Sequence, residues 1–272
     1  MPKSFELQVD SAIIRGQSVH SPGAKPSLIF LHAGVADTRM YSRQFAGLTN
    51  QCNITSFDRR GFGKTSATDE PFSQVDDLLA VVESVEGGKH ILVGCSQGAR
   101  IAIDFAIRYP KKIEALVLIS ATYSGANAPN PDAHEAALIA QIDAADERDD
   151  LEALNRLEAH LWLDGPHSEA GRVTAEAREL FLDMNGIALN SIELTQEREP
   201  GSAAEKISTI ECPVLLIEGG RDASFIIERH NQLASWLHNC RRAVVPQAAH
   251  LIPLETPAEL NELLMKFLLE IG

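Results

Sequence analysis

The sequence predicts an α/β protein with a mostly parallel central sheet and helices on both faces. Short apolar runs of strand length, such as 27–31 and 115–119, alternate with segments of helical pattern. Continuously apolar runs are typical of strands buried on both faces of a parallel sheet, and the alternation favours the same architecture. At 90–98 a strand-like run meets a Gly-x-Ser-x-Gly pentad, and a helical pattern follows at once. These three observations fix the predicted fold class.

The first half of the chain supplies an edge hairpin and then alternating elements. Two β-like stretches at 5–9 and 12–16 predict an antiparallel hairpin, and 20–26 has the composition of a loop. The expected elements that follow are strands at 27–31, 54–57 and 90–95 and helices at 40–48 and 76–85.

A helix that begins near Gln97 must end at Tyr109, because Pro110 cannot continue it. The remaining expected elements are strands at 115–119, 213–217 and 243–245 and helices at 225–237 and 257–271.

The alternation breaks at 121–212, where the pattern is almost wholly helical and acidic. Helices are expected to open at Asn130-Pro131-Asp132 and at Asp149-Asp150, the second ending at Asp164-Gly165-Pro166, and a third pattern covers 170–184. About ninety residues are too many for a structureless loop. We therefore predict a core domain of residues 1–120 and 213–272 and an inserted helical cap of residues 121–212.

Composition narrows the functional class. The chain has 272 residues, 44% of them apolar, and a formal net charge of −14, which argues against nucleic-acid and anionic membrane surfaces as partners. It has no apolar run long enough to cross a bilayer, and its start lacks a secretory pattern. The expectation is a soluble cytoplasmic protein. Four scattered cysteines, Cys52, Cys95, Cys212 and Cys240, predict free thiols rather than a disulfide framework or zinc knuckle.

The pentad places Ser96 at a sharp strand-to-helix turn. Such a turn holds a serine in strained backbone geometry with its hydroxyl exposed at the carboxyl edge of the sheet. Gly94 and Gly98 fit close approach of strand and helix, where a side chain would clash. The helix that starts at Gln97 aims its free N–H groups and dipole at negative charge forming beside Ser96. The alternative is a strand–glycine–helix connection with an incidental serine.

Two further residues complete a possible catalytic set. Asp222 follows the strand at 213–217, and His250 follows the strand at 243–245, so both emerge with Ser96 at the carboxyl edge of the sheet. Acyl transfer needs a nucleophile, a base and a group that orients the base. Alternatives remain for each: Asp222 could cap a helix, Glu218 is a nearby competing carboxylate, and His250 could be a satisfied loop histidine. The segment 120–124 contains no carboxylate, which favours Asp222.

The chain resembles an α/β-hydrolase with a helical cap over nearly its whole length. The pentad around Ser96, the turn Gly219-Gly220-Arg221-Asp222 and the late His250 stand in the order of that family's triad. His32-Ala33-Gly34 is similar to the family's oxyanion loop, with alanine at the usual glycine. The resemblance implies that the backbone N–H groups of Gly34 and Gln97 hold the oxyanion. The turn Asp58–Gly63 resembles one that is usually structural in the family.

The resemblance implies a cofactor-independent serine hydrolase whose partner is a small molecule. Ser96 would attack a carbonyl as His250 takes its proton, Asp222 would orient the imidazole, and water would release the acyl-enzyme. The expected substrate is a small carboxylic ester, lactone or thioester. The same triad serves amide or C–C bond hydrolysis, perhydrolysis and acyl transfer, and the fold also serves small-ligand receptors with slow turnover or a non-catalytic scaffold. Oligomeric state stays open.

Other motifs in the sequence give weaker evidence about function. We expect no metal site: the helix containing His134-Glu135 has Leu138 where a zinc protease has its second histidine, so it is interpreted as ordinary helix surface. No dinucleotide fingerprint follows the first strands. His32 is interpreted as a satisfied loop histidine and Cys95 as buried filler. Within the cap, Tyr123, Trp162, Phe181 and Met184 are candidates for lining the substrate pocket, with core packing as the alternative.

Overall fold

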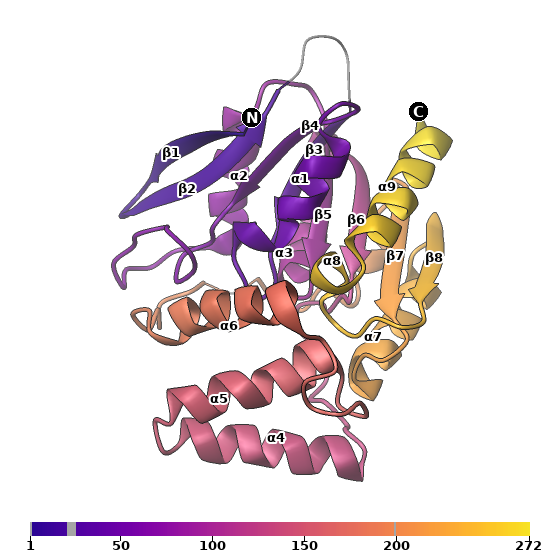
Figure 1. Ribbon diagram of the computed structural model, residues 1–272. Helices are drawn as coiled ribbons and strands as arrows, with labels where there is room; N and C mark the ends of the chain where they lie inside the picture. The colour runs from indigo at the N-terminus through magenta and orange to yellow at the C-terminus, as the bar shows by residue number, and fades with distance from the viewer. Residues whose placement is uncertain (1, 21–25, 199) are drawn as a thin grey trace.

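The centre of the molecule is an eight-stranded, mostly parallel sheet (Figure 1). The computed structural model describes residues 2–20, 26–198 and 200–272, so most of the loop predicted at 20–26 lies outside the described residues. The strands are β1 (Lys3–Val9), β2 (Ala12–Val19), β3 (Ser27–Leu31), β4 (Asn53–Phe57), β5 (His90–Cys95), β6 (Ile113–Ile119), β7 (Val214–Gly219) and β8 (Cys240–Val245). Their order is β1-β2-β4-β3-β5-β6-β7-β8. β1 and β2 pair antiparallel, β2 joins β4 antiparallel, and the rest of the sheet is parallel, which confirms the predicted fold class and edge hairpin.

Helices cover both faces of this sheet. The α-helices are α1 (Ser42–Leu48), α2 (Gln74–Ser84), α3 (Gln97–Arg108), α4 (Ala133–Asp146), α5 (Leu151–Glu158), α6 (Ala175–Leu189), α7 (Ser224–Trp236), α8 (Ile252–Glu255) and α9 (Pro257–Ile271). Short helical turns are η1 (Thr38–Tyr41), η2 (Pro110–Lys112), the π-helical η3 (Ala159–Asp164) and η4 (Ile207–Thr209).

Strand alternation divides the core into two apolar layers. On β3, Leu28 and Phe30 pack with α1 and α9, whereas Ile29 and Leu31 pack with α2, α3 and α7. Successive strand side chains point to opposite faces, so strands buried on both faces are mostly apolar throughout. This is why continuous apolar runs were sufficient to place β3, β6 and β7, whereas β4 also buries Thr55 and Ser56.

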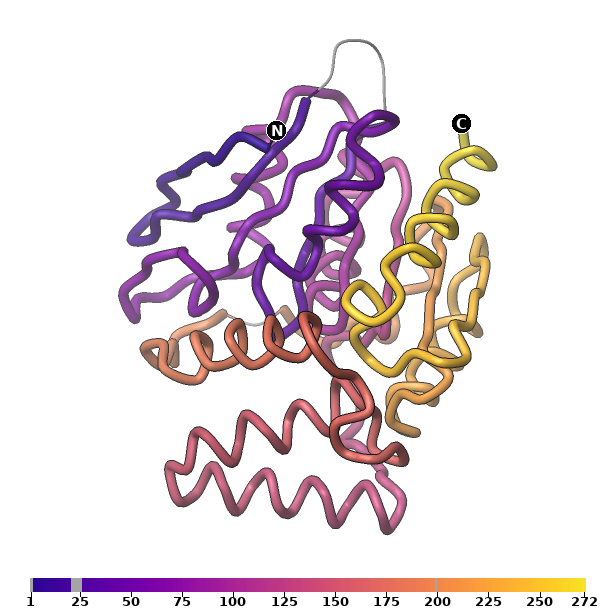
Figure 2. Tube along the Cα trace, viewed as in Figure 1, coloured from indigo at the N-terminus to yellow at the C-terminus, as the bar shows by residue number. Residues whose placement is uncertain are grey.

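Helices α4, α5 and α6 lie beyond the carboxyl ends of the parallel strands, with α6 next to the sheet (Figure 1). The trace in Figure 2 shows the chain leaving the sheet after β6 and returning to it before β7. A small apolar cluster that includes Leu138 and Leu161 packs on Phe225 of α7. We keep the name cap for the predicted segment 121–212, which carries these helices; its division from the core as a separate domain stays a prediction.

The expectation that 121–212 is almost wholly helical was wrong at both ends. Residues 121–132, 190–198 and 200–206 are mostly irregular, and the helix expected from 170 begins only at Ala175. The reason is Asp164: its buried carboxylate accepts the backbone N–H groups of Gly171 and Val173, each at 2.8 Å. Those N–H groups are therefore turned inward rather than along a helix axis.

Smaller differences concern element ends. The helix expected at 40–48 is divided into η1 and α1, and α8 was not predicted. All four cysteines are free, as expected. Among the described residues, no helix is both long and apolar enough to span a bilayer.

Candidate active site

Ser96 lies on a strained turn between β5 and α3. Its backbone has φ 54° and ψ −115°, a region that residues with a side chain rarely occupy. A Cβ on Gly94 would lie 2.4 Å from the carbonyl oxygen of Gly98, and one on Gly98 would lie 2.2 Å from that of Leu31. The close approach predicted for both glycines is thus confirmed. Ser96 itself is only partly buried, as an attacking hydroxyl requires.

Asp222 and His250 form a buried pair. The imidazole Nδ1 lies 2.8 Å from Oδ2 and 3.0 Å from Oδ1 of Asp222. Both side chains are almost fully buried. An Nδ1–H that donates to the carboxylate leaves Nε2 with its lone pair free, which is the tautomer a general base needs.

The loops that carry this pair pack backbone against backbone. The Arg221 N–H donates to the carbonyl of Ala248 at 2.9 Å. A Cβ on Gly219 would lie 2.0 Å from the carbonyl oxygen of Ala249, so only glycine fits there. The glycines before Asp222 therefore allow the acid loop to lie directly against the histidine loop.

Glu218, the competing carboxylate, has other partners. It accepts a hydrogen bond from Nη2 of Arg242 at 3.0 Å, and its other oxygen lies 3.7 Å from Nδ1 of His230. Asp222 is the carboxylate that the structure places against His250.

The residue before the serine contacts the histidine loop. The thiol of Cys95 donates to the carbonyl of His250 at 3.8 Å, which brings the turn at Ser96 beside the loop that carries His250. Cys95 is fully buried, as expected, and burial raises the pKa of its thiol. Within the described residues, no hydrogen bond joins Ser96 Oγ to His250. In free enzymes such hydrogen bonds are often long and tighten only when substrate binds.

The two residues expected to hold an oxyanion are neighbours. A Cβ on Gly34 would lie 2.9 Å from the side-chain amide of Gln97. Gln97 is the first residue of α3, and the first N–H groups of a helix have no intrahelical acceptor. The structure therefore brings Gly34 next to the first residue of α3, and their role as oxyanion donors stays a prediction.

Arg59 donates two hydrogen bonds to the loop before Gly34. The Arg59 N–H donates to Nε2 of His32 at 3.0 Å, and its Nη2 donates to the carbonyl of Ala33 at 3.2 Å. Because Nε2 accepts, His32 carries its proton on Nδ1 and donates it to the Ala33 carbonyl at 2.7 Å. Burial lowers the pKa of His32 well below its ordinary value. His32 is a satisfied loop histidine, as predicted.

The four cap candidates for the pocket have different surroundings. The ring of Trp162 lies 4.6 Å from that of His250, centroid to centroid, so this residue is at the site. Phe181 and Met184 are buried in the apolar layer that contains Cys95. Tyr123 lies in the opposite layer, where its hydroxyl donates to Gln232 at 2.5 Å. Tyr123 therefore has the contacts of a core residue.

A buried carboxylate that sequence reasoning missed supports the histidine loop. Glu255 accepts the N–H of Ala249, the neighbour of His250, at 2.8 Å. It also forms an ion pair with Arg172 of the cap, which donates to the carbonyl of Gln247 at 3.1 Å. Burial raises the pKa of Glu255 to about 7. The sequence contains no spacing pattern that relates Glu255 to Ala249 and Arg172.

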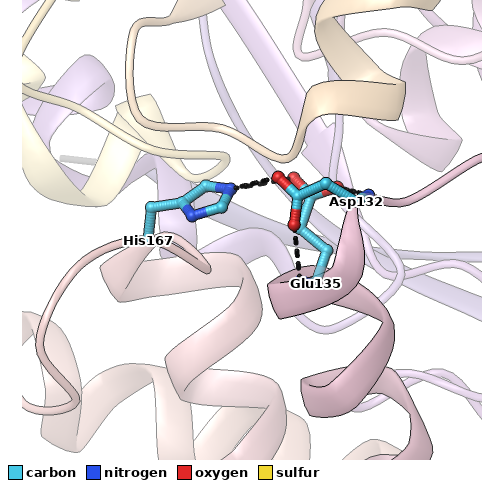
Figure 3. A group of neighbouring side chains, drawn as sticks. All are labelled: Asp132, Glu135 and His167. Atoms are coloured by element: carbon cyan, nitrogen blue, oxygen red, sulfur yellow. Dashed lines mark hydrogen bonds and ion pairs between the residues drawn. The ribbon is translucent and has the colours of Figure 1, made fainter.

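Figure 3 shows a cluster of three neighbouring side chains at the start of α4 and in the loop after η3: Asp132, Glu135 and His167. Their ligand atoms lie within 4.8 Å of one another, which is close enough to hold a metal ion. They also satisfy one another and the backbone: His167 Nε2 lies 2.9 Å from Asp132, and Glu135 accepts the Ser224 N–H at 2.6 Å. Glu135 is fully buried, so its interpretation as ordinary helix surface was wrong. The capping box that begins α4 turns it inward onto α7.

Comparisons with known proteins agree with this architecture. A family model described as the alpha/beta hydrolase family matches residues 28–263. A putative 2-succinyl-6-hydroxy-2,4-cyclohexadiene-1-carboxylate synthase of Bacillus subtilis is 27% identical over 98% of this chain and 99% of its own length. A pimeloyl-[acyl-carrier protein] methyl ester esterase of Nitrosospira multiformis is 23% identical over 92% of this chain and 97% of its own. The chain spans only 17% of another relative, the chloroplastic protein PHYLLO of Arabidopsis thaliana.

Among solved structures, the esterase RhEst1 from Rhodococcus sp. ECU1013 superposes with a TM-score of 0.80 at 16% identity, covering 100% of this chain and 99% of the esterase. At that identity the likeness concerns the fold.

Proposed function

Because the chain belongs to the alpha/beta hydrolase family, we propose that it is a serine hydrolase that cleaves small carboxylic ester-like substrates through an acyl-enzyme on Ser96. The observation that carries this proposal is the buried His250–Asp222 hydrogen bond at the edge of the sheet where Ser96 occupies a strained turn. A buried acid that orients an imidazole near a partly exposed serine has no structural need to be there, whereas nucleophilic catalysis requires all three.

In the proposed first step, His250 Nε2 takes the proton of Ser96 as the hydroxyl oxygen attacks the carbonyl carbon. Asp222 keeps the imidazole in the required tautomer and stabilises its cationic form. The negative charge that develops on the carbonyl oxygen is held by the N–H groups of Gly34 and Gln97 and by the positive end of α3. The imidazolium then protonates the departing alkoxide or thiolate.

In the second step, His250 activates a water molecule that attacks the acyl-enzyme, and the acid leaves as the proton returns to Ser96. The cap gives this site its boundary, since Trp162 lies directly on the imidazole. The ester-like class is supported by the name of the Nitrosospira relative, an ester esterase. A substrate small enough to lie between the cap and the sheet edge is the partner we propose.

The test combines labelling with turnover. The purified protein is incubated with a fluorophosphonate probe and assayed on 4-nitrophenyl acetate and butyrate. We expect covalent labelling and repeated turnover, and we expect Ser96→Ala to lose both. Ser235→Ala, on the exposed side of α7, is the matched control and should retain both. Labelling that persists in Ser96→Ala would assign a different nucleophile. A single slow turnover would instead support a small-ligand receptor.

A further inference from the structure

Arg59 is a buried cation, only 2% exposed. The charge of Glu197 acts on it from nearby, but no carboxylate within the described residues accepts a hydrogen bond from its side chain. One nitrogen, Nη2, donates to the carbonyl of Ala33, and the guanidinium lies 4.5 Å over the ring of Phe62. Nε is buried and has no hydrogen-bond partner. Burying a charge without a partner is costly, so such a group needs an explanation.

The neighbouring Arg60 shows what a structural arginine in this turn looks like. It makes two hydrogen bonds to the buried carboxylate of Asp77, from Nε at 2.7 Å and from Nη2 at 2.8 Å. Its charge is therefore compensated within the fold. The adjacent Arg59 comes from the same turn, but its side chain contacts a backbone carbonyl and an aromatic ring rather than a hydrogen-bonded carboxylate.

Arg59 borders a cavity that is also lined by Gln97, the neighbour of Ser96. The cavity has a volume of about 230 Å³, and its walls include Arg59, Phe62, Gln97, Leu194 and Glu197. Gln97 is the residue whose N–H is proposed to hold the oxyanion. Glu197, the carboxylate in the wall, lies 3.4 Å from Arg100, so Arg59 shares this anion with a second arginine. The cavity thus has in its walls both Arg59 and the residue that directly follows Ser96.

We propose that Arg59 determines specificity by binding a carboxylate at the end of the substrate remote from the scissile bond. The inference rests on the proposed function and names its substrate class: half-esters, or corresponding thioesters or lactones, of dicarboxylic acids. The planar guanidinium offers donors in a fork that matches a carboxylate. A carboxylate in the cavity would add a directly hydrogen-bonded negative charge and supply an acceptor for Nε.

The electrostatics agree with this role. Burial, together with the nearby Arg100, lowers the pKa of Arg59 to about 9 although the charge of Glu197 opposes this shift, so the group is still charged at neutral pH but at a cost. A bound carboxylate offsets that cost, which makes its binding stronger than it would be at an exposed arginine. A neutral substrate of the same length leaves the cost in place.

The experiment compares two esters that differ only in this charge: mono-4-nitrophenyl glutarate and its methyl-capped diester, both followed by release of 4-nitrophenol. The wild type is expected to prefer the carboxylate in kcat/KM by about 10- to 100-fold, mainly through KM, the range for a hydrogen bond to a charged group. Arg59→Gln should abolish that preference, and Arg59→Lys should retain part of it. Arg43→Gln removes an exposed arginine paired with Glu176 and should leave the preference unchanged.

The ratio of the kcat/KM values for the two esters distinguishes an Arg59 that determines specificity from one that only supports the oxyanion loop. Because Arg59 also holds the Ala33 carbonyl, its loss can lower activity on both esters. An equal loss on both, with the preference intact, would show that Arg59 only positions the oxyanion loop. A wild type without preference would overturn the proposal directly, even if the variants failed to fold.

Binding measured without turnover separates this proposal from the proposed function. Calorimetry with Ser96→Ala should show tighter binding of monomethyl glutarate than of dimethyl glutarate. Equal binding of the two refutes the carboxylate subsite. Turnover of neither ester, with monomethyl glutarate still preferred, would instead refute the hydrolase and keep the subsite.

Discussion

The indole of Trp162 lies on the imidazole of His250, with ring centroids 4.6 Å apart and ring planes inclined by 45°. A cap residue of η3 thus contacts the proposed base of the core. Trp162 also meets Phe225 of α7 edge to face at 6.3 Å, so the indole is held from two sides. The cap is therefore part of the candidate site rather than a cover at a distance.

Removing this indole should loosen the site. We expect Trp162→Ala to lower kcat/KM for 4-nitrophenyl butyrate by about 10-fold or more, because a loss of 1.4 kcal/mol in aromatic contact already corresponds to that factor. Trp162→Phe should retain most of the activity. Steady-state kinetics of both variants checks this. Unchanged kinetics in Trp162→Ala would place the substrate away from the cap.

The acid can be tested against its neighbour. Asp222→Asn is expected to lower kcat by about 10⁴-fold, as the corresponding change does in a serine protease, because the amide favours the wrong imidazole tautomer. Glu218→Gln changes a carboxylate in the same strand-to-loop segment that pairs with Arg242 and should have a small effect on kcat. The measurement is kcat under saturating ester. Equal losses in the two variants would contradict the assignment.

The candidate site could be predicted where the backbone itself imposes the residue type. Gly94 and Gly98 have no room for a side chain, so these two glycines alone predict the turn at Ser96. Residues that pair only through the tertiary structure leave no such signal in the sequence. Arg59 and Arg60 are adjacent and alike, but Asp77 reaches only Arg60. From the sequence alone Glu135 is predicted to lie on the surface, because its burial depends on the packing of α7 against it.

The joint between Glu135 and Ser224 should stabilise the whole chain. Glu135 is buried and accepts both the backbone N–H and the hydroxyl of Ser224, two residues after Asp222. Glu135→Ala leaves the N–H without its acceptor and is expected to lower the free energy of unfolding by about 2–3 kcal/mol. Denaturant unfolding measures this.

The matched control for that experiment is Glu147→Ala, which removes an exposed carboxylate at the far end of α4. It should change the free energy of unfolding by less than about 0.5 kcal/mol. If Glu135→Ala were as mild as the control, the contact with Ser224 would contribute nothing to stability.

His230 should make the protein sensitive to mild acid. Burial lowers its pKa from 6.5 to about 4, and the surrounding charges are those of Asp222, His250 and Arg242, with Glu218 3.7 Å from Nδ1. Its Nε2 accepts the N–H of Ala121 at 2.5 Å, which a protonated ring cannot do. Since the folded pKa lies below the unfolded one, the unfolded chain binds the extra proton between these values.

The contribution of His230 to stability is therefore complete above about pH 6.5 and is lost as the pH falls toward 4. A shift from 6.5 to about 4 corresponds to a loss of up to about 3 kcal/mol. His230→Gln keeps a side-chain acceptor but cannot titrate, so its free energy of unfolding should vary less between pH 7.5 and 4.5 than that of the wild type. His238→Gln, on the exposed side of the chain after α7, should follow the wild type. Denaturant unfolding at several pH values decides the matter: parallel curves for the wild type and His230→Gln would mean that His230 takes up its proton equally in the folded and unfolded chain.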